Sequence, residues 1–287
     1  MTYLPPNKSD ARESAIIDAV NNGKALPIRW AAIRTCIPGH SATFLVMADA
    51  LKLDVETIDA VGKQVTAKNI RANVTAKTSQ ILADILDCSM LTAKLADAIW
   101  DQADVHVLPC SMVQTEADTQ HMSETTWMIE HSERVDKKLV SMDAAATPSM
   151  CMLDEPERTA FEDKAPADAD FSVLVSTVGK HWIIEEELVH HPGMACNYGW
   201  HFSGATYGSN AYEVSVTGKS RLIQGRGTKH NPAHSDYSQT LVLVRNWCLV
   251  DGALQDLRGL LQDHELAGLA NQSGAMTYLR QAGVAAP

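Results

Sequence analysis

Three short segments in the second half of the chain combine histidines with aromatic and charged residues. They are VGKHW at 178–182, NYGWH at 197–201 and KHNPAHSDYS at 229–238. Histidine and aspartate are common proton donors and acceptors in enzyme sites, and aromatic rings give such sites rigid apolar walls. We therefore expect these three segments to form one site.

His234 and Asp236 in the third segment are separated by one residue. On a strand this spacing points both side chains to one face, about 7 Å apart, which is close enough for both to bind one metal ion. His201 or His181 would complete a set of two histidines and one carboxylate, which is compatible with zinc. The predicted metal ligands are therefore His201, His234 and Asp236, with zinc as the predicted ion.

A second arrangement of the same segments needs no metal. Its hydroxyl group would come from Ser238 or Tyr237. His201 or His181 would act as the base, and Asp236 would orient that base. The chain has no GxSxG motif to support a serine nucleophile. The predicted catalytic residues are His181, His201, Asp236 and Ser238, with Cys196 as an alternative nucleophile.

Charged and aromatic residues of the same region would bind the substrate. Lys180 or Arg226 would pair with its negative charge. If the NYGWH segment is a regular strand, Tyr198 and Trp200 lie on one face and His201 on the other. The predicted substrate-binding residues are Lys180, Trp182, Tyr198, Trp200, Arg226 and Tyr237.

The pair Trp200-His201 is similar to the C-terminal Trp-His of zinc D,D-carboxypeptidases, which trim bacterial cell-wall peptides. This resemblance implies a cell-wall substrate. The other two ligands of that family form an upstream H-x6-D arrangement, and no histidine before Trp200 has an aspartate seven positions later. Over most of its length the chain resembles uncharacterised bacterial or phage-borne proteins that contain GKHW, NYGWH and DYS segments, and this second resemblance implies no mechanism.

The elements before these segments have helical patterns. Residues 9–24 combine capping-box spacing at Asp10 with an apolar face and an Asn-Gly stop. Residues 75–104 predict a helical hairpin, and 122–141 predict a further helix. Residues 40–54 are apolar enough for a buried helix, although part of this stretch would also suit a strand.

A change of pattern divides the chain into regions. Residues 1–143 are predicted to be mainly helical. Residues 144–170 are rich in Ala, Pro and Asp, which favours a linker or long loop. Residues 171–287 predict a β-rich region with the site and a C-terminal helix. We therefore expect an α+β fold, a helical N-terminal portion followed by a mixed or antiparallel sheet.

The composition excludes several classes of protein. With 45% hydrophobic and 21% charged residues the chain is typical of folded proteins, and its net charge of −11 argues against sequence-independent nucleic-acid binding. The N-terminus has no signal-peptide pattern, and no apolar run approaches the roughly 20 residues of a membrane span. We expect synthesis and folding in the cytoplasm, with release or virion incorporation as later fates, and six reduced cysteines.

Two functions fit these observations. The leading prediction is a hydrolase that acts through a His/Asp site on a polar small molecule or polymer, such as a cell-wall peptide or saccharide. The alternative is a non-enzymatic binding or assembly protein, for example a virion or surface component. Its aromatic residues would then form a ligand platform or a contact between subunits of a homo-oligomer.

Overall fold

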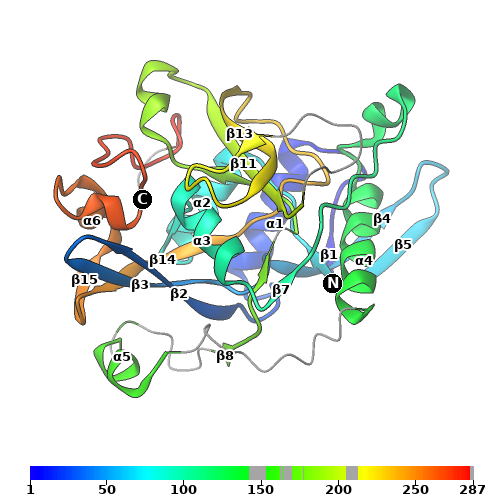
Figure 1. Cartoon of the computed structure of the whole chain (residues 1–287). Coiled ribbons are helices and arrows are strands. Elements are labelled where there is room, and N and C mark those ends of the chain that lie inside the picture. The colour runs from blue at the N-terminus through cyan, green and yellow to red at the C-terminus, as the bar shows by residue number, and fades with distance from the viewer. Residues whose placement is uncertain (142–152, 162–163, 165–169, 177, 205–212, 285–287) are drawn as a thin grey trace.

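The structure is a computed structural model that describes residues 1–141, 153–161, 164, 170–176, 178–204 and 213–284. Helices and strands are mixed throughout these residues, so the fold is α+β as predicted (Figure 1). The helices are not confined to the N-terminal part, which corrects that detail of the expectation.

The largest sheet contains strands from both ends of the chain. Its order is β15-β14-β3-β2-β8, and β6 pairs with β14 beside this path. The antiparallel pair of β3 and β14 joins the predicted regions 1–143 and 171–287 in one sheet. The strands are β2 (Arg29–Ile37), β3 (His40–Met47), β6 (Cys88–Met90), β8 (Asp170–Phe171), β14 (Leu243–Val250) and β15 (Ala253–Asp256).

Four strands lie between residues 29 and 71, part of the region that was expected to be mainly helical. They are β2, β3, β4 (Lys52–Ile58) and β5 (Gln64–Arg71). Six consecutive residues at the end of β3 are buried. A strand covered on both faces has a continuous apolar sequence, which resembles that of a buried helix. The helical interpretation of residues 40–54 was therefore wrong, and the alternative of a strand over part of this stretch is confirmed by β3.

A second sheet has the order β1-β4-β5, with β1 at Thr2–Tyr3. Helix α4 (Thr125–Ser141) packs on β4 and β5, and α1 (Asp10–Asn21) contacts α2. The N-cap of α1 lies one residue before the predicted one, because Ser9 and not Asp10 accepts the Arg12 N–H, and the helix begins at Asp10.

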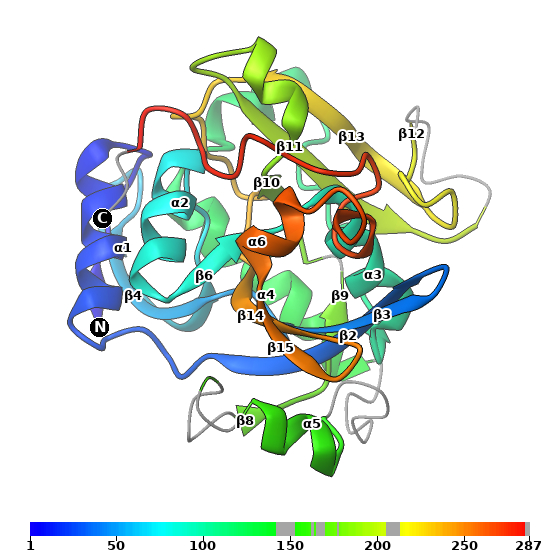
Figure 2. The same cartoon turned by 90° about the vertical axis from the view of Figure 1, so that its left-hand side faces the viewer.

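The predicted helical hairpin is confirmed as α2 (Ala76–Ile85) and α3 (Ala93–Gln102), with β6 between them. Helix α3 contacts both β2 and β11 and lies between their two sheets (Figures 1 and 2). The side chains of α3 therefore lie against the sheet that carries the predicted site.

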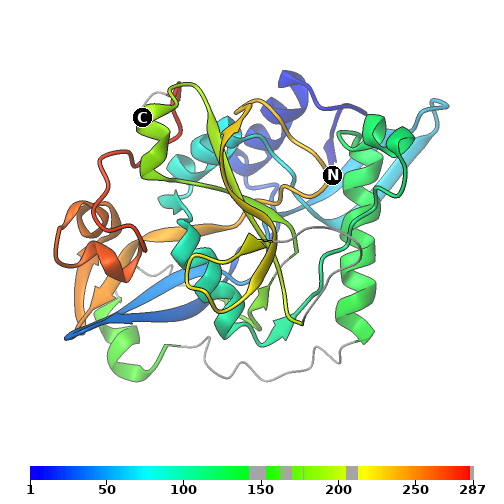
Figure 3. The same ribbon diagram turned by 45° about the horizontal axis from the view of Figure 1, so that its top comes forward.

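That third sheet is antiparallel and has the order β10-β11-β13-β12 (Figure 3). Two segments of the predicted site lie on β10 and β11. The third spans the end of β13 and the loop that follows it. The strands are β10 (Lys180–Ile183), β11 (Ala195–Phe202), β12 (Glu213–Val214) and β13 (Arg221–His230).

The remaining elements are short. Strand β7 (Val105–His106) pairs with β9 (Val175–Ser176), and the predicted C-terminal helix is α6 (Leu257–Gln262). Much of the predicted linker 144–170 lies outside the described residues, and its described part contains α5 (Glu155–Ala160). Among the residues described, none of the helices is both long and apolar enough to cross a membrane.

Candidate functional site

The predicted segments form two separate His–Asp pairs instead of one site. His201 pairs with Asp97 of α3, which lies outside the predicted segments, and His234 pairs with Asp236. Both carboxylates are buried, but the histidines differ. The side chain of His201 is 3% exposed, whereas that of His234 is 42% exposed.

The backbone of strand β11 is irregular, and this irregularity decides which of its side chains share a face. The φ angles of Gly199 and Trp200 are 120° and 59°, both in the region that bulky residues rarely adopt. Tyr198 Oη and His201 Nε2 lie 2.7 and 2.8 Å from the same oxygen, Asp97 Oδ1. The predicted alternation, which placed Tyr198 and His201 on opposite faces, is therefore wrong, because two consecutive positive φ angles interrupt the regular pleat.

The Asp97 carboxylate is fully buried and hydrogen-bonded at both oxygens. Besides Tyr198 and His201 on Oδ1, the Thr217 N–H donates to Oδ2 at 2.9 Å. Burial by itself would raise the pKa of Asp97, but the hydrogen bond and charge of His201, with the bonds from Thr217 and Tyr198, lower it overall. The His201 ring also stacks on Trp100, with ring centres 5.7 Å apart.

His181 belongs to the same buried set. A side chain at Gly199 would lie 3.4 Å from His181 Cδ2 and 3.8 Å from His201 Cε1, so both imidazoles approach this glycine. Burial, and then the proximity of His201, lower the pKa of His181 to about 4. The ring is therefore neutral at pH 7. These buried residues hold α3 against β11 and do not face solvent.

The Asp236 carboxylate is the centre of the second pair. Its Oδ2 lies 3.4 Å from both His234 Nε2 and Lys180 Nζ. Its Oδ1 accepts hydrogen bonds from the backbone N–H and the hydroxyl of Ser238. The Asp236 N–H donates to Gln239 Oε1 at 2.7 Å. The hydrogen bonds of the loop from 234 to 239 are thus centred on Asp236.

This carboxylate is ionised at neutral pH. Its burial would raise the pKa of Asp236, but the hydrogen bond from His234, the charge of Lys180 and the Ser238 bonds hold it well below the usual range. The side chain of Lys180 is 14% exposed, between the values for Asp236 and His234. The exposed fraction of the side chain therefore increases from Asp236 through Lys180 to His234.

Aromatic rings surround the inner side of this pair. Lys180 Nζ lies 5.7 Å from the centre of the Trp200 ring, a distance that allows a cation–π interaction. Trp200 packs with Tyr237 and with His131 of α4. Tyr237 Oη accepts the Met112 N–H, so its hydroxyl is engaged within the protein. Trp200 therefore belongs with Lys180, on the other side of the strand from Asp97.

Several predicted residues have purely internal partners. Trp182 donates its indole N–H to Val74 O at 2.8 Å. Trp182, Tyr198, Trp200 and Tyr237 are all buried, so none offers an open ring face as a ligand platform. Burial raises the pKa of the Cys196 thiol, which does not favour a thiolate nucleophile. The five described cysteines are free, and Cys151 lies outside the described residues.

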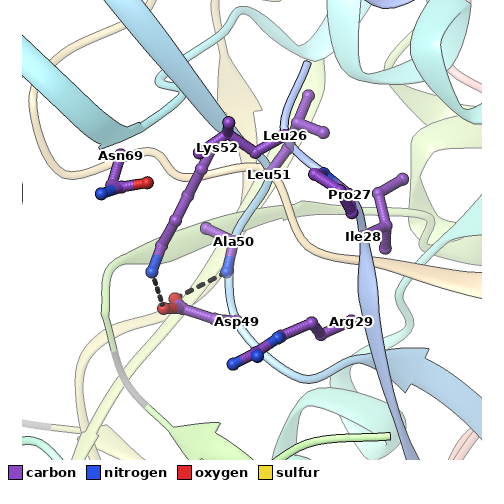
Figure 4. A pocket seen from close by; sticks show the side chains of 9 residues that line it. All are labelled: Leu26, Pro27, Ile28, Arg29, Asp49, Ala50, Leu51, Lys52 and Asn69. Atoms are coloured by element: carbon purple, nitrogen blue, oxygen red, sulfur yellow. Dashed lines mark hydrogen bonds and ion pairs between the residues drawn. The ribbon is translucent and has the colours of Figure 1, made fainter. Parts of the chain in front are cut away.

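Arg226 belongs to neither of the two His–Asp pairs. It contacts Glu185 Oε2 and Ser273 Oγ, at 3.3 and 3.2 Å, and lines a cavity of about 470 Å³ with both residues. A further cavity of about 350 Å³ lies between the start of β2 and the start of β4 (Figure 4). Sequence reasoning did not anticipate this second cavity.

The predicted zinc ligands are not brought together as a set. His201 is engaged by Asp97, while His234 and Asp236 form the other pair. Across the described residues, no group of three or more His, Cys, Asp or Glu side chains is arranged to hold a metal ion. Zinc chemistry therefore has no geometric support here.

Sequence reasoning also missed residues that complete the two pairs. Asp97 lies on a helix whose apolar stripe was taken as core, and a single aspartate there gives no signal of burial. His131 and Gln239 were likewise not predicted. Only the HxD spacing of His234 and Asp236 identified a pair correctly, although these residues lie in a loop and not on a strand.

In comparisons with known proteins, the chain matches no family model, no curated protein and no solved structure.

Proposed function

We propose that the chain is a hydrolase of a polar substrate, in which His234 is the general base and Asp236 orients it. The observation that carries this proposal is the contrast in exposure within the pair, with the carboxylate 3% and the imidazole 42% exposed. A general base must reach the substrate, while its orienting carboxylate interacts more strongly when water is excluded.

The geometry suggests how the proton moves. His234 Nε2 faces Asp236 Oδ2, which leaves the other ring nitrogen, Nδ1, to accept a proton from an attacking water. The resulting imidazolium lies beside a carboxylate that stays ionised. Lys180 Nζ is close enough to the pair to stabilise negative charge that develops on the substrate.

Ser238 takes a different role from the one predicted. Its hydroxyl donates to Asp236 Oδ1, so it positions the carboxylate and is not activated by a histidine. The proposal accordingly uses water as the nucleophile.

Cell-wall peptide or saccharide remains the proposed substrate class, on the strength of the sequence resemblance at Trp200-His201. The binding or assembly function stays as the alternative outcome of the experiment. Its aromatic platform is not favoured, because Trp182 and Tyr198 are buried.

The test is digestion of purified peptidoglycan, with the products separated and identified by mass spectrometry. We expect His234→Ala to lower the rate by at least about 100-fold, the usual contribution of a general base. The matched control is His264→Ala at another exposed histidine, which should keep wild-type activity. Both variants should melt within about 2 °C of wild type, because neither removes a buried group.

Full activity of His234→Ala would overturn the assignment of the base. If the wild-type chain releases no product from peptidoglycan, a panel of chromogenic esters, amides and glycosides tests hydrolysis in general. Failure on the whole panel would favour the binding function.

A further inference from the structure

The cavity in Figure 4 lies where two sheets meet, at the start of β2 and the start of β4. Residues 26–28 form one wall, which we call the 26–28 arch. The arch is fixed at both ends, because the Leu26 N–H donates to Lys52 O at 2.9 Å and the Ala48 N–H donates to Arg29 O at 2.8 Å. Fixed ends keep the arch from collapsing into the space.

Asp49 lies at the floor of the cavity and pairs with Arg71, which does not itself line the space. The side chain of Arg71 is 0% exposed and also contacts Asp136 Oδ1 at 2.7 Å. Although burial would raise the pKa of Asp49, the charges of Arg71 and Lys52 bring it down to about 2, so it is ionised. This network of buried charges resists rearrangement, because the loss of one partner would leave the other charge buried without compensation.

The hydrogen-bonding capacity of Asp49 is fully used inside the protein. Oδ1 accepts from Ala50 N at 2.7 Å and from Arg71 Nε at 2.9 Å. Oδ2 accepts from Arg71 Nη2 at 2.7 Å and lies 2.8 Å from Lys52 Nζ. A carboxylate has about four acceptor positions, and four donors fill them. Among the described residues that line the cavity, Asp49 is the only carboxylate, and it has no acceptor position left for a ligand.

The side chains around this floor offer mainly donors. The Lys52 ammonium carries three protons, and the contact with Asp49 uses one of them. Arg29, whose Nη1 contacts Ser172 Oγ at 3.3 Å, contributes a guanidinium to the same lining, and Asn69 contributes an amide with both donor and acceptor atoms. The rest of the wall is apolar, and the side chains of Leu26, Pro27 and Ile28 lie along the arch in Figure 4.

We propose that this cavity binds a small organic carboxylate that carries an apolar group. The ligand carboxylate accepts hydrogen bonds from the cationic side of the lining, and Lys52 is its principal partner. The apolar group packs against the 26–28 arch and Leu51. The volume of about 350 Å³ is within the range of small-molecule sites. This site is separate from Asp236 and does not depend on the hydrolase proposal.

The test uses benzoate as the probe and benzamide, which has the same ring without the charge, as its matched control. Titrations of the ¹⁵N-labelled full chain, followed by NMR, report both affinity and location. We expect benzoate to shift the amide signals of Lys52 and Asn69 with a Kd of about 1 mM or tighter. Benzamide should bind at least about tenfold more weakly, because it lacks the charge-assisted bond.

Two variants complete the experiment. Lys52→Met removes the ammonium but keeps most of the apolar stem, and we expect it to weaken benzoate binding by about tenfold or more. Lys24→Met, an exposed lysine that does not line the cavity, should bind as wild type does. The assignment is overturned if benzoate gives no saturable shift at these amides, if benzamide binds equally well, or if Lys52→Met retains wild-type affinity.

Discussion

The two His–Asp pairs use the same side chains for different purposes. Asp97 and His201 lie between α3 and β11, and both are almost completely buried. Asp236 is equally buried, but its partner His234 lies in a loop with 42% of its side chain exposed. Burial of both groups makes the first pair a structural connection between a helix and a sheet, whereas an exposed imidazole on a buried carboxylate makes the second pair suitable for proton transfer.

The comparison shows that residue type does not by itself locate a site. NYGWH contains the densest aromatic and histidine pattern of the chain, yet His201 and Tyr198 both point to an interior aspartate. The HxD pair has a more ordinary sequence and the more accessible base. Position relative to solvent decides which pair meets a substrate.

The largest expected effect is on the buried pair. Asp97→Ala leaves His201, Tyr198 and the Thr217 N–H without their common partner, so we expect the free energy of unfolding to fall by about 3–5 kcal/mol. Urea denaturation followed by circular dichroism measures this change.

The control is Asp101→Ala on the same helix, whose partner Lys219 is 68% exposed, so the loss of this ion pair should cost less than about 1 kcal/mol. Equal costs for Asp97→Ala and Asp101→Ala would contradict the structural role of the buried pair.

The second prediction concerns the pH dependence of stability. The pKa of His181 is about 4 in the folded protein and 6.5 in its ordinary state, so the unfolded chain binds the additional proton between these values. Stability contributed by neutral His181 is therefore lost as pH falls from 6.5 toward 4, with a slope of up to about 1.4 kcal/mol per pH unit. His181→Asn should flatten the stability profile in this window.

Denaturation series across that pH range measure the slope. His264→Asn serves as the reference, because an exposed histidine is in water in both states. A profile of His181→Asn as steep as that of wild type would show that His181 is not buried in neutral form.

The smallest expected effect tests the backbone that separates the pairs. Gly199→Ala places a side chain at φ 120°, a backbone conformation that residues other than glycine rarely adopt, while its nearest neighbour, His181 Cδ2 at 3.4 Å, lies at an ordinary van der Waals distance. We therefore expect backbone strain to cost about 1–3 kcal/mol. Gly193→Ala is the matched control, with φ 81° and nothing within 4 Å of the added atom, and should cost about 1 kcal/mol. The same cost at both glycines would mean that φ 120° at Gly199 adds no strain beyond that of φ 81° at Gly193.

Local patterns predicted part of the fold well. The apolar periodicity of 75–104 predicted α2 and α3, because each helix buries one continuous face. The apolar content of residues 40–54 was a poorer guide and favoured a helix, because six consecutive residues of β3 are buried, and β3 therefore lacks the alternation that identifies a strand.

The sequence alone determined the α+β class and the meeting of His234 with Asp236, because both depend on residues close together in the chain. Tertiary structure decided everything that depends on distant partners. Asp97 lies 104 positions from His201, and only the packing of α3 under β11 brings them together. The two positive φ angles at Gly199 and Trp200 then set which side chains share a face, since a single step out of the regular pleat moves a residue from one side of the sheet to the other.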